Sequence, residues 1–314
     1  MGQLCAFRFG AGQESIGAVN EGYIDVPGGR VWYKITGDGD ETPLLCLHGG
    51  PGSAHYCLEP LEALGRRRRV IFYDQLGCGN SDRPDNPALW TLDRFVEELA
   101  QVRAALGLER LHLFGSSWGG VLALQYVLDR NPQLDSLILC GSPASMPRWA
   151  ADCAELLERQ PAEVVRVIRE HEASGFTTCP EYQSAILGFY REHFCRLDPW
   201  PACLERSFAE TGYPVYFAMN GPSEFTITGT MKDWDVMDRL GEIEVPTLLI
   251  CGRHDECRPS HLEEMHRRLP DSQVAIIENA SHLCFVEQPV EFTVRVNDFF
   301  DRTDSSISDE LAAR

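Results

Sequence analysis

Ser117 lies between two glycines, in the segment Gly115-Ser116-Ser117-Trp118-Gly119, and this spacing favours nucleophilic chemistry. An apolar, strand-like run over 111–114 precedes the segment, and a largely apolar helical pattern over 119–128 follows it. A serine in a tight turn between a strand and a helix presents its hydroxyl above the sheet, and glycines relieve the crowding there. Gly-x-Ser-x-Gly alone is common in turns. The strand-to-helix setting therefore makes Ser117 the candidate nucleophile.

A serine hydroxyl becomes a good nucleophile only when a base takes its proton, and a carboxylate usually orients that base. Asp255 and His282 each come just after an apolar, strand-like run late in the chain. The chain order serine, aspartate, histidine is that of α/β-hydrolases. His254 and Asp271 are less well placed, because Asp271 precedes its expected strand and His254 is expected only to line the loop.

The loop His48–Gly52, with the sequence HGGPG, follows another apolar run. Its glycines let the backbone approach a substrate closely, so the N–H groups of Gly50 and Trp118 are expected to bind a developing oxyanion. Taken alone, the loop would be an ordinary Gly/Pro turn. Because a candidate nucleophile, acid and base are also present in the chain, we favour the oxyanion role for this loop. This chemistry requires no metal and no organic cofactor.

The elements that must position these residues alternate along the chain. Eight short apolar runs are interspersed with amphipathic patterns over 92–106, 119–128 and 289–300. Strands that alternate with helices predict a mostly parallel sheet with helices on both faces, and we expect an eight-stranded α/β-hydrolase fold. The expected strands are 22–26, 31–36, 43–47, 70–73, 111–114, 136–140, 247–251 and 273–277.

The alternation breaks over residues 144–240, where helical patterns surround an interval rich in tryptophan and proline. We interpret this stretch as a helical cap inserted into an α/β core made of residues 18–143 and 241–302. Residues 303–314 are polar and are expected to form a flexible tail.

Composition narrows the possible partners. The 314 residues include 28 Lys and Arg against 47 Asp and Glu, a net charge of −19, which disfavours nucleic acid and anionic membranes. The run Arg66–Arg69 is expected to be a solvated loop that leads into a strand. No apolar run approaches the roughly 18 to 20 residues of a membrane-spanning helix, and we expect an uncleaved, cytoplasmic protein. The 12 scattered cysteines lack a Cys-x-x-Cys pair, so reduced thiols are expected.

Five segments together carry a family resemblance: His48–Gly52, Asp74–Ser81, Gly115–Gly120, Gly252–Glu256 and Asn279–His282. The chain resembles the proline iminopeptidase family of α/β-hydrolases, over about residues 22–300. The segment Asn220–Phe225 is similar to the cap motif of the tricorn-interacting type of aminopeptidase. It is also similar to that of the related L-amino acid amidases, including proline amide hydrolases.

This resemblance implies a serine hydrolase that cleaves the amide bond after an unblocked amino-terminal residue, with proline expected. The substrate would be a small peptide or an amino acid amide. Recognition of a free ammonium calls for charge-assisted hydrogen bonds, and Glu224 and Glu256 match the family positions that supply them. Tyr216, Phe217 and Trp234 of the cap are expected to wall an apolar slot for the substrate side chain.

Two other function classes are compatible with these residues. An esterase or lactonase would share the catalytic residues, accept neutral substrates and not need Glu224. A non-catalytic ligand-binding protein on the same fold would bind without turnover. Cys57, Cys257 and Cys284 lie close in sequence to the candidate catalytic residues, so a bulky thiol reagent is expected to slow the enzyme.

Overall fold

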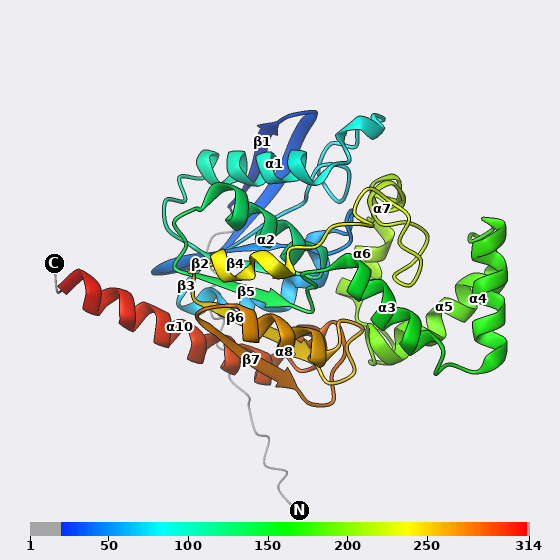
Figure 1. Cartoon of the computed structure of the whole chain (residues 1–314). Coiled ribbons are helices and arrows are strands. Elements are labelled where there is room, and N and C mark those ends of the chain that lie inside the picture. Colours follow the sequence, from blue (N-terminus) through cyan, green and yellow to red (C-terminus); the bar gives the residue numbers. More distant parts are fainter. Residues whose placement is uncertain (1–19, 313–314) are drawn as a thin grey trace, which may run out of the picture.

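A computed structural model of the chain describes residues 20–312, and its centre is one mixed sheet of seven strands. Strands β2, β4, β5, β6 and β7 run parallel in that order, while β1 and β3 each pair with β2 in the antiparallel sense (Figure 1). The strands are β1 Asn20–Val26, β2 Gly29–Leu47, β3 Arg68–Tyr73, β4 His112–Ser116, β5 Ser136–Cys140, β6 Thr247–Gly252 and β7 Ser272–Ile277.

Each of the eight expected strand segments overlaps a strand of the sheet. The segments 31–36 and 43–47 are two ends of the single long strand β2, so the sheet has seven strands where eight were expected. The pairing of β2 with β3 shifts register several times between Thr36 and Cys46, where the strand bends. The expected mostly parallel sheet is confirmed with this one difference.

Alternate residues of each central strand enter two separate hydrophobic clusters, as the two-residue period of a strand requires. Leu45 and Leu113 belong to the cluster on one face, and Leu44 and Phe114 belong to the other. Helices α1, α2 and α8 contribute to the first cluster, and η1, α9 and α10 contribute to the second. The elements are η1 His55–Arg66, η2 Pro87–Leu89, α1 Leu92–Ala105, α2 Trp118–Arg130, α8 Pro259–Arg268, α9 Cys284–Glu287 and α10 Pro289–Ala312.

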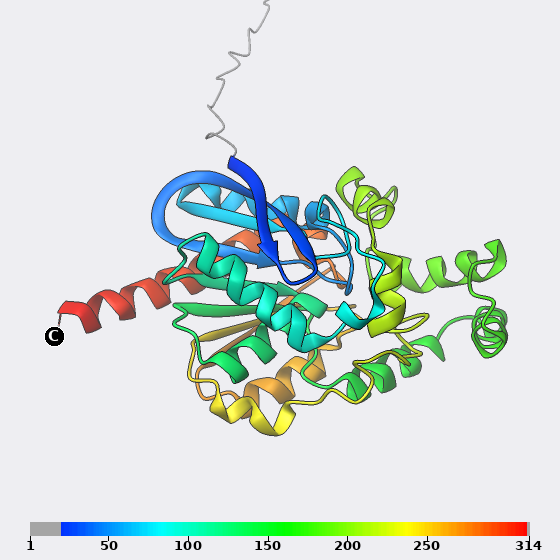
Figure 2. The same ribbon diagram turned by 90° about the horizontal axis from the view of Figure 1, so that it is seen from above.

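The chain between β5 and β6 forms helices and no strand of the sheet, and it lies beside the carboxyl ends of the parallel strands (Figures 1 and 2). Helices α4 and α5 lie farthest from the sheet and pack mainly against each other. We call residues 144–240 the cap. Its elements are α3 Met146–Leu157, α4 Ala162–Ser174, α5 Pro180–His193, α6 Ala202–Ala209, α7 Tyr213–Met219 and η3 Met237–Glu242, which extends two residues past the cap.

Helix α10 continues to Ala312, well beyond its expected end at residue 300. Thr303 is buried and its hydroxyl donates to the Phe300 carbonyl at 3.0 Å. The segment expected as a tail is therefore helical as far as residue 312. Residues 313–314, like residues 18–19 at the expected start of the core, lie outside the described residues.

Arg68 corrects the expectation of a solvated arginine loop, because its side chain is fully buried in β3. The guanidinium donates to the Thr42 carbonyl at 2.9 Å and to Glu41 at 2.7 Å. It also lies 3.9 Å from the ring centre of Phe300 and pairs with Asp304 at 3.3 Å. These contacts join β2, β3 and α10, and they satisfy a charge that would be costly to bury alone.

The 11 cysteines within residues 20–312 are all free thiols. None of the helices in this part of the chain combines the length and the apolar character needed to span a membrane.

Candidate active site

Ser117 occupies the turn between β4 and α2, with φ 54° and ψ −122°. Non-glycine residues rarely adopt such a backbone conformation, and it is typical of a nucleophile presented at a strand-to-helix turn. The flanking glycines are required because strand and helix nearly touch. A Cβ on Gly119 would lie 2.3 Å from the Leu47 carbonyl oxygen, and one on Gly115 would lie 2.5 Å from the backbone of Gly119.

His282 and Asp255 form a buried hydrogen-bonded pair, with 2.8 Å between Nδ1 and Oδ1. Asp255 follows β6 and His282 follows β7, so the sheet brings both to the edge where β4 ends. Asp255 also accepts a hydrogen bond from the backbone N–H of Cys257 at 2.7 Å. A Cβ on Gly141 would lie 2.8 Å from both side chains, so a glycine there makes room for the pair. With Nδ1 engaged, Nε2 is the imidazole nitrogen available to a serine hydroxyl.

The two expected oxyanion donors line the same cavity as Ser117 and His282. Gly50 has φ 115°. A Cβ on Gly50 would lie 2.6 Å from the backbone nitrogens of both Gly52 and Ser53. Trp118 is the first residue of α2, so its N–H has no acceptor within the helix. Both candidate donors therefore belong to residues of the cavity that Ser117 lines.

Glu224 and Glu256 both line this cavity, one from the cap and one from the loop after β6. The Glu224 carboxylate accepts hydrogen bonds from the hydroxyls of Tyr190 and Tyr216, each at 2.8 Å. Glu256 is 1% exposed, and its Oε2 has no hydrogen-bond partner within the described part of the chain. Burial, and then the negative charges of Glu224 and Asp255, raise the pKa of Glu256 well above its ordinary value. A bound cation would relieve this unfavourable burial.

The cavity has a volume of about 450 Å³ and lies between the strand ends and the cap. Tyr216 and Phe217 line it as expected. Trp234 does not, since its indole N–H donates to Gln125 on α2 at 2.8 Å, at the base of the cap. The apolar and aromatic lining includes Val121, Met146, Trp149, Ile186, Phe194, Leu204, Phe208 and Met231.

Only one of the three cysteines singled out in the sequence lines the cavity. Cys57 does so, whereas Cys257 and Cys284 are buried outside it. Burial raises the pKa of Cys57 to about 12, so its thiolate is scarce at neutral pH. The blocking effect expected of a bulky thiol reagent is therefore restricted to Cys57.

A family profile and several known proteins match most of this chain. Residues 42–289 match the profile described as the alpha/beta hydrolase fold. A proline iminopeptidase of Heyndrickxia coagulans is 42% identical over 285 residues, which cover 90% of this chain and 98% of that protein. The chain belongs to the proline iminopeptidase family. A proline iminopeptidase of Saccharolobus solfataricus is 37% identical over 288 residues, which cover 90% of this chain and 93% of the relative.

Solved structures agree with this membership in the proline iminopeptidase family. The crystal structure of a proline iminopeptidase from Mycobacterium smegmatis has a TM-score of 0.84 and 37% identity, with 92% of this chain and all of that chain covered. The crystal structure of VinJ has a TM-score of 0.86 and 36% identity, with 91% and 99% covered. The resemblance inferred from the five sequence segments is therefore confirmed.

Sequence reasoning missed Gln75, whose side chain links the loop that carries Gly50 to the indole of Trp118 in this family member. Gln75 donates from Nε2 to the His48 carbonyl at 3.2 Å and accepts from the Trp118 indole at 2.7 Å. Its backbone N–H donates to Nε2 of His48 at 3.0 Å, so Nδ1 of His48 carries the proton that is donated to Gly49. Burial lowers the pKa of His48 to about 4, which keeps the ring neutral. The segment Asp74–Ser81, one of the five that carry the family resemblance, was the feature of the sequence that could have pointed to Gln75.

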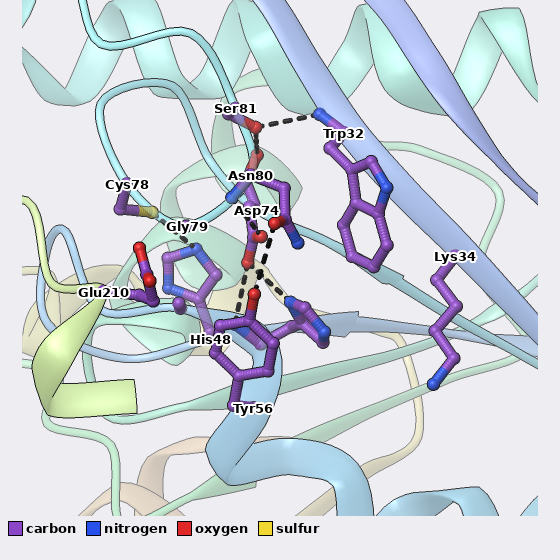
Figure 3. A network of polar contacts seen from close by, with 12 residues as sticks. Trp32, Lys34, His48, Tyr56, Asp74, Cys78, Gly79, Asn80, Ser81 and Glu210 are labelled. Atoms are coloured by element: carbon purple, nitrogen blue, oxygen red, sulfur yellow. Dashed lines mark hydrogen bonds and ion pairs between the residues drawn. The ribbon is translucent and has the colours of Figure 1, made fainter. Parts of the chain in front are cut away.

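Asp74 fixes the adjoining loop (Figure 3). Its Oδ1 accepts from the backbone N–H and the ring nitrogen of His55, each at 2.8 Å, and its Oδ2 accepts from the Asn80 N–H at 2.9 Å. Burial alone would raise the pKa of Asp74, but the His55 contacts hold it below its ordinary value. Ser81 extends the network by accepting from the Trp32 N–H at 2.8 Å. The loop beside Gln75 is thus anchored to β2 and η1.

Two aromatic rings that the sequence did not single out hold the imidazole of His282. Phe194 stacks on it at 5.4 Å between ring centres, and Trp149 meets it edge-on at 5.7 Å. Both rings come from the cap, whose aromatic content was visible but whose spatial order was not.

Proposed function

We propose that this protein is a serine hydrolase that removes an unblocked amino-terminal residue, with proline preferred, from a small peptide or an amino acid amide. The observation that carries the proposal is the pair of acids, Glu224 and Glu256, in one cavity with Ser117 and with His282, which is hydrogen-bonded to Asp255. The names of the curated relatives support the same activity.

In the proposed mechanism, Ser117 attacks the carbonyl carbon while Nε2 of His282 takes its proton. Asp255, at 2.8 Å from Nδ1, holds the ring and stabilises its charged form. The N–H groups of Gly50 and Trp118 bind the oxyanion. His282 then protonates the departing amine, and water repeats the sequence on the acyl-enzyme.

The substrate ammonium would lie between Glu224 and Glu256. Glu224 is already oriented by two tyrosine hydroxyls, and Glu256 has an oxygen without a partner in the described residues. A secondary ammonium such as that of proline has two N–H donors, so each carboxylate can accept one. An esterase or lactonase with neutral substrates gains nothing from burying these two acids, and this argues for the amidase over that alternative.

Hydrolysis of three chromogenic substrates tests this function. They are free L-prolyl anilide, the same anilide with its nitrogen acetylated, and a neutral short-chain ester. Turnover of the free anilide, at least about 100-fold faster than that of the blocked one, is expected because the acetyl group removes the charge that the acids bind. Ser117→Ala should abolish this turnover in correctly folded protein.

The other two function classes predict different results on the same panel. An esterase would cleave the ester and leave both anilides intact. A ligand-binding protein without catalysis would cleave none of the three, although it would bind proline derivatives in calorimetry.

A further inference from the structure

Glu172, in the last turn of α4, is a half-buried acid outside the set that carries the proposed chemistry. Its Oε1 accepts from the hydroxyls of Tyr182 at 2.8 Å and Ser223 at 2.6 Å. Its Oε2 accepts from the hydroxyl of Thr226. One carboxylate thus gathers three hydroxyl donors, and hydrogen bonds to a charged acceptor are stronger than neutral ones.

Two of these donors flank Glu224. Ser223 and Thr226 pair with each other as an isolated β-bridge, so the turn that they close carries Glu224 between them. The amide of Asn220 donates to the Ser223 carbonyl at 3.1 Å and closes the turn from inside. Glu172 therefore binds the side-chain hydroxyls of the turn that carries Glu224, whereas Tyr190 and Tyr216 bind the Glu224 carboxylate itself.

Glu172 also joins helix α4, on which it lies, to Tyr182 of helix α5. Helices α4 and α5 pack mainly on each other and project from the body of the molecule (Figures 1 and 2). Tyr182, on α5, lines the cavity and is 1% exposed. Burial, and then the charges of Glu172 and Glu224, raise the pKa of Tyr182. Both acids thus act on one phenol at the cavity wall.

We propose that Glu172 is a positioning residue of the ammonium site, which holds the Glu224 turn against helices α4 and α5. It keeps the Glu224 carboxylate directed into the cavity and adds a third negative charge beside a site for a cation. The inference rests on the proposed function, because it concerns where the substrate ammonium is bound. A role confined to cap stability would instead make Glu172 equally important for every substrate.

Variants at Glu172 separate these two roles. Glu172→Ala should raise KM for free L-prolyl anilide about tenfold or more, since a small misplacement of a binding group weakens recognition strongly. The slower turnover of the acetylated anilide, which makes no ammonium contact, should change less than about twofold. Glu172→Gln keeps one side-chain oxygen that can accept two hydrogen bonds. Its KM for the free anilide should therefore lie between those of wild type and Glu172→Ala. Glu170→Gln, at an exposed acid on the same helix, is the matched control and should leave both substrates unaffected.

A double-mutant cycle tests whether Glu172 acts through Glu224. In a Glu224→Gln background, Glu172→Ala should add less than about a twofold further loss, because the carboxylate that it positions has already been removed. If Glu172→Ala does not fold, Ser223→Ala combined with Thr226→Val breaks the same contacts from the turn and should reproduce the rise in KM.

The proposal is overturned if the Glu172 and turn variants leave KM for the free anilide at its wild-type value. It is equally overturned if they reduce the turnover of the free and the acetylated anilide alike, or if the losses from Glu172→Ala and Glu224→Gln are additive. Failure of the proposed function would look different: the wild-type protein itself would then not prefer the free anilide over the acetylated one.

Discussion

At the scale of single residues, the burial of Glu256 is electrostatically unfavourable in the substrate-free site. The residue is buried, one of its oxygens lacks a partner in the described residues, and Glu224 and Asp255 both repel its charge. Nε2 of His282 lies 3.8 Å away and is a poor compensating cation while the ring is neutral. The raised pKa means that the protonated form of Glu256 persists to a higher pH than in an ordinary glutamate, and a cationic ligand favours release of that proton.

Binding of a simple cation should accordingly depend on pH. Because the pKa of Glu256 is raised, its carboxylate forms as the pH rises, and the affinity for pyrrolidine should increase from about pH 5 to about pH 8. The measurement is the inhibition constant of pyrrolidine, which stays cationic over this range. Glu256→Gln should show weaker binding and a smaller pH dependence. An inhibition constant that does not change with pH in the wild type would contradict this account.

The same shift has an opposite consequence for stability. A folded-state pKa above the unfolded value means that the folded protein binds more protons, so this group lowers stability as the pH rises past the ordinary glutamate value. Glu256→Gln should therefore raise the melting temperature of the substrate-free protein at about pH 8 relative to wild type. Thermal unfolding followed by circular dichroism checks the sign, and a lower melting temperature for the variant would refute it.

Cys57 is the cavity cysteine through which a thiol reagent can act. Its pKa of about 12 predicts slow modification at neutral pH and a rate that rises steadily as the solution becomes more alkaline. Loss of activity with N-ethylmaleimide should follow that rate and disappear in Cys57→Ser. Cys257→Ser is the control, because this thiol is buried outside the cavity. Inactivation that persists in Cys57→Ser would sink the assignment.

At the scale of elements, Gln75 joins three segments that meet at the nucleophile: the loop after β2, the loop after β3 and the start of α2. Gln75→Leu removes the acceptor of the Trp118 indole and the donor to the His48 carbonyl. We expect kcat to fall about 10- to 100-fold with a smaller change in KM, because the oxyanion donors act mainly in the transition state.

Gln125→Leu is a matched control for Gln75→Leu, since Gln125 also accepts from a tryptophan indole, that of Trp234, outside the cavity lining. This control should leave kcat unchanged. Equal effects of the two substitutions on kcat would show that Gln75 only stabilises the fold.

Elements were more predictable than the contacts between them. Local periodicity sufficed for α1, which begins after Thr91, whose hydroxyl accepts from the Arg94 N–H at 3.4 Å. The continuity of β2 escaped prediction because the polar residues 37–42, including two glycines, resemble a turn in sequence. The strand continues through these residues with a bend, at which Gly37 has φ 77°, and Asp40 and Glu41 pair with Arg68 of β3.

The candidate site was predictable where a motif fixes the backbone, and less so where side chains from the cap converge. Ser117 was named from its motif between a strand and a helix, and Asp255 and His282 from their places after later strands. The catalytic roles of all three stay predictions. The placement of Trp234 was wrong, and the tyrosine hydroxyls on Glu224 were not foreseen. Composition gives the number of aromatic residues in the cap, but only tertiary packing decides which rings reach the cavity.

At the scale of the whole molecule, the buried guanidinium of Arg68 ties helix α10 to the sheet. Arg68→Ala removes its bonds to Glu41 and Thr42 and its packing on Phe300, so we expect a loss of about 2–4 kcal/mol in the free energy of unfolding. Urea denaturation measures this loss.

Arg67→Ala is the control for this prediction. Arg67 also pairs with Glu41 and with a second acid, but its side chain is 39% exposed. Arg67→Ala should lower the free energy of unfolding by at most about 1 kcal/mol, because exposed ion pairs contribute little to stability. Similar losses for Arg67→Ala and Arg68→Ala would contradict the assigned role of Arg68.

The central claim is that two acids select a free ammonium for a serine nucleophile. Its most direct test is the ratio of kcat/KM for free and N-acetylated L-prolyl anilide, measured in wild type and in the Glu224→Gln/Glu256→Gln double variant. We predict a ratio of at least about 100 in the wild type that falls toward one in the double variant, as two charge-assisted bonds are lost. A wild-type ratio near one, or a high ratio that survives in the double variant, would contradict the claim.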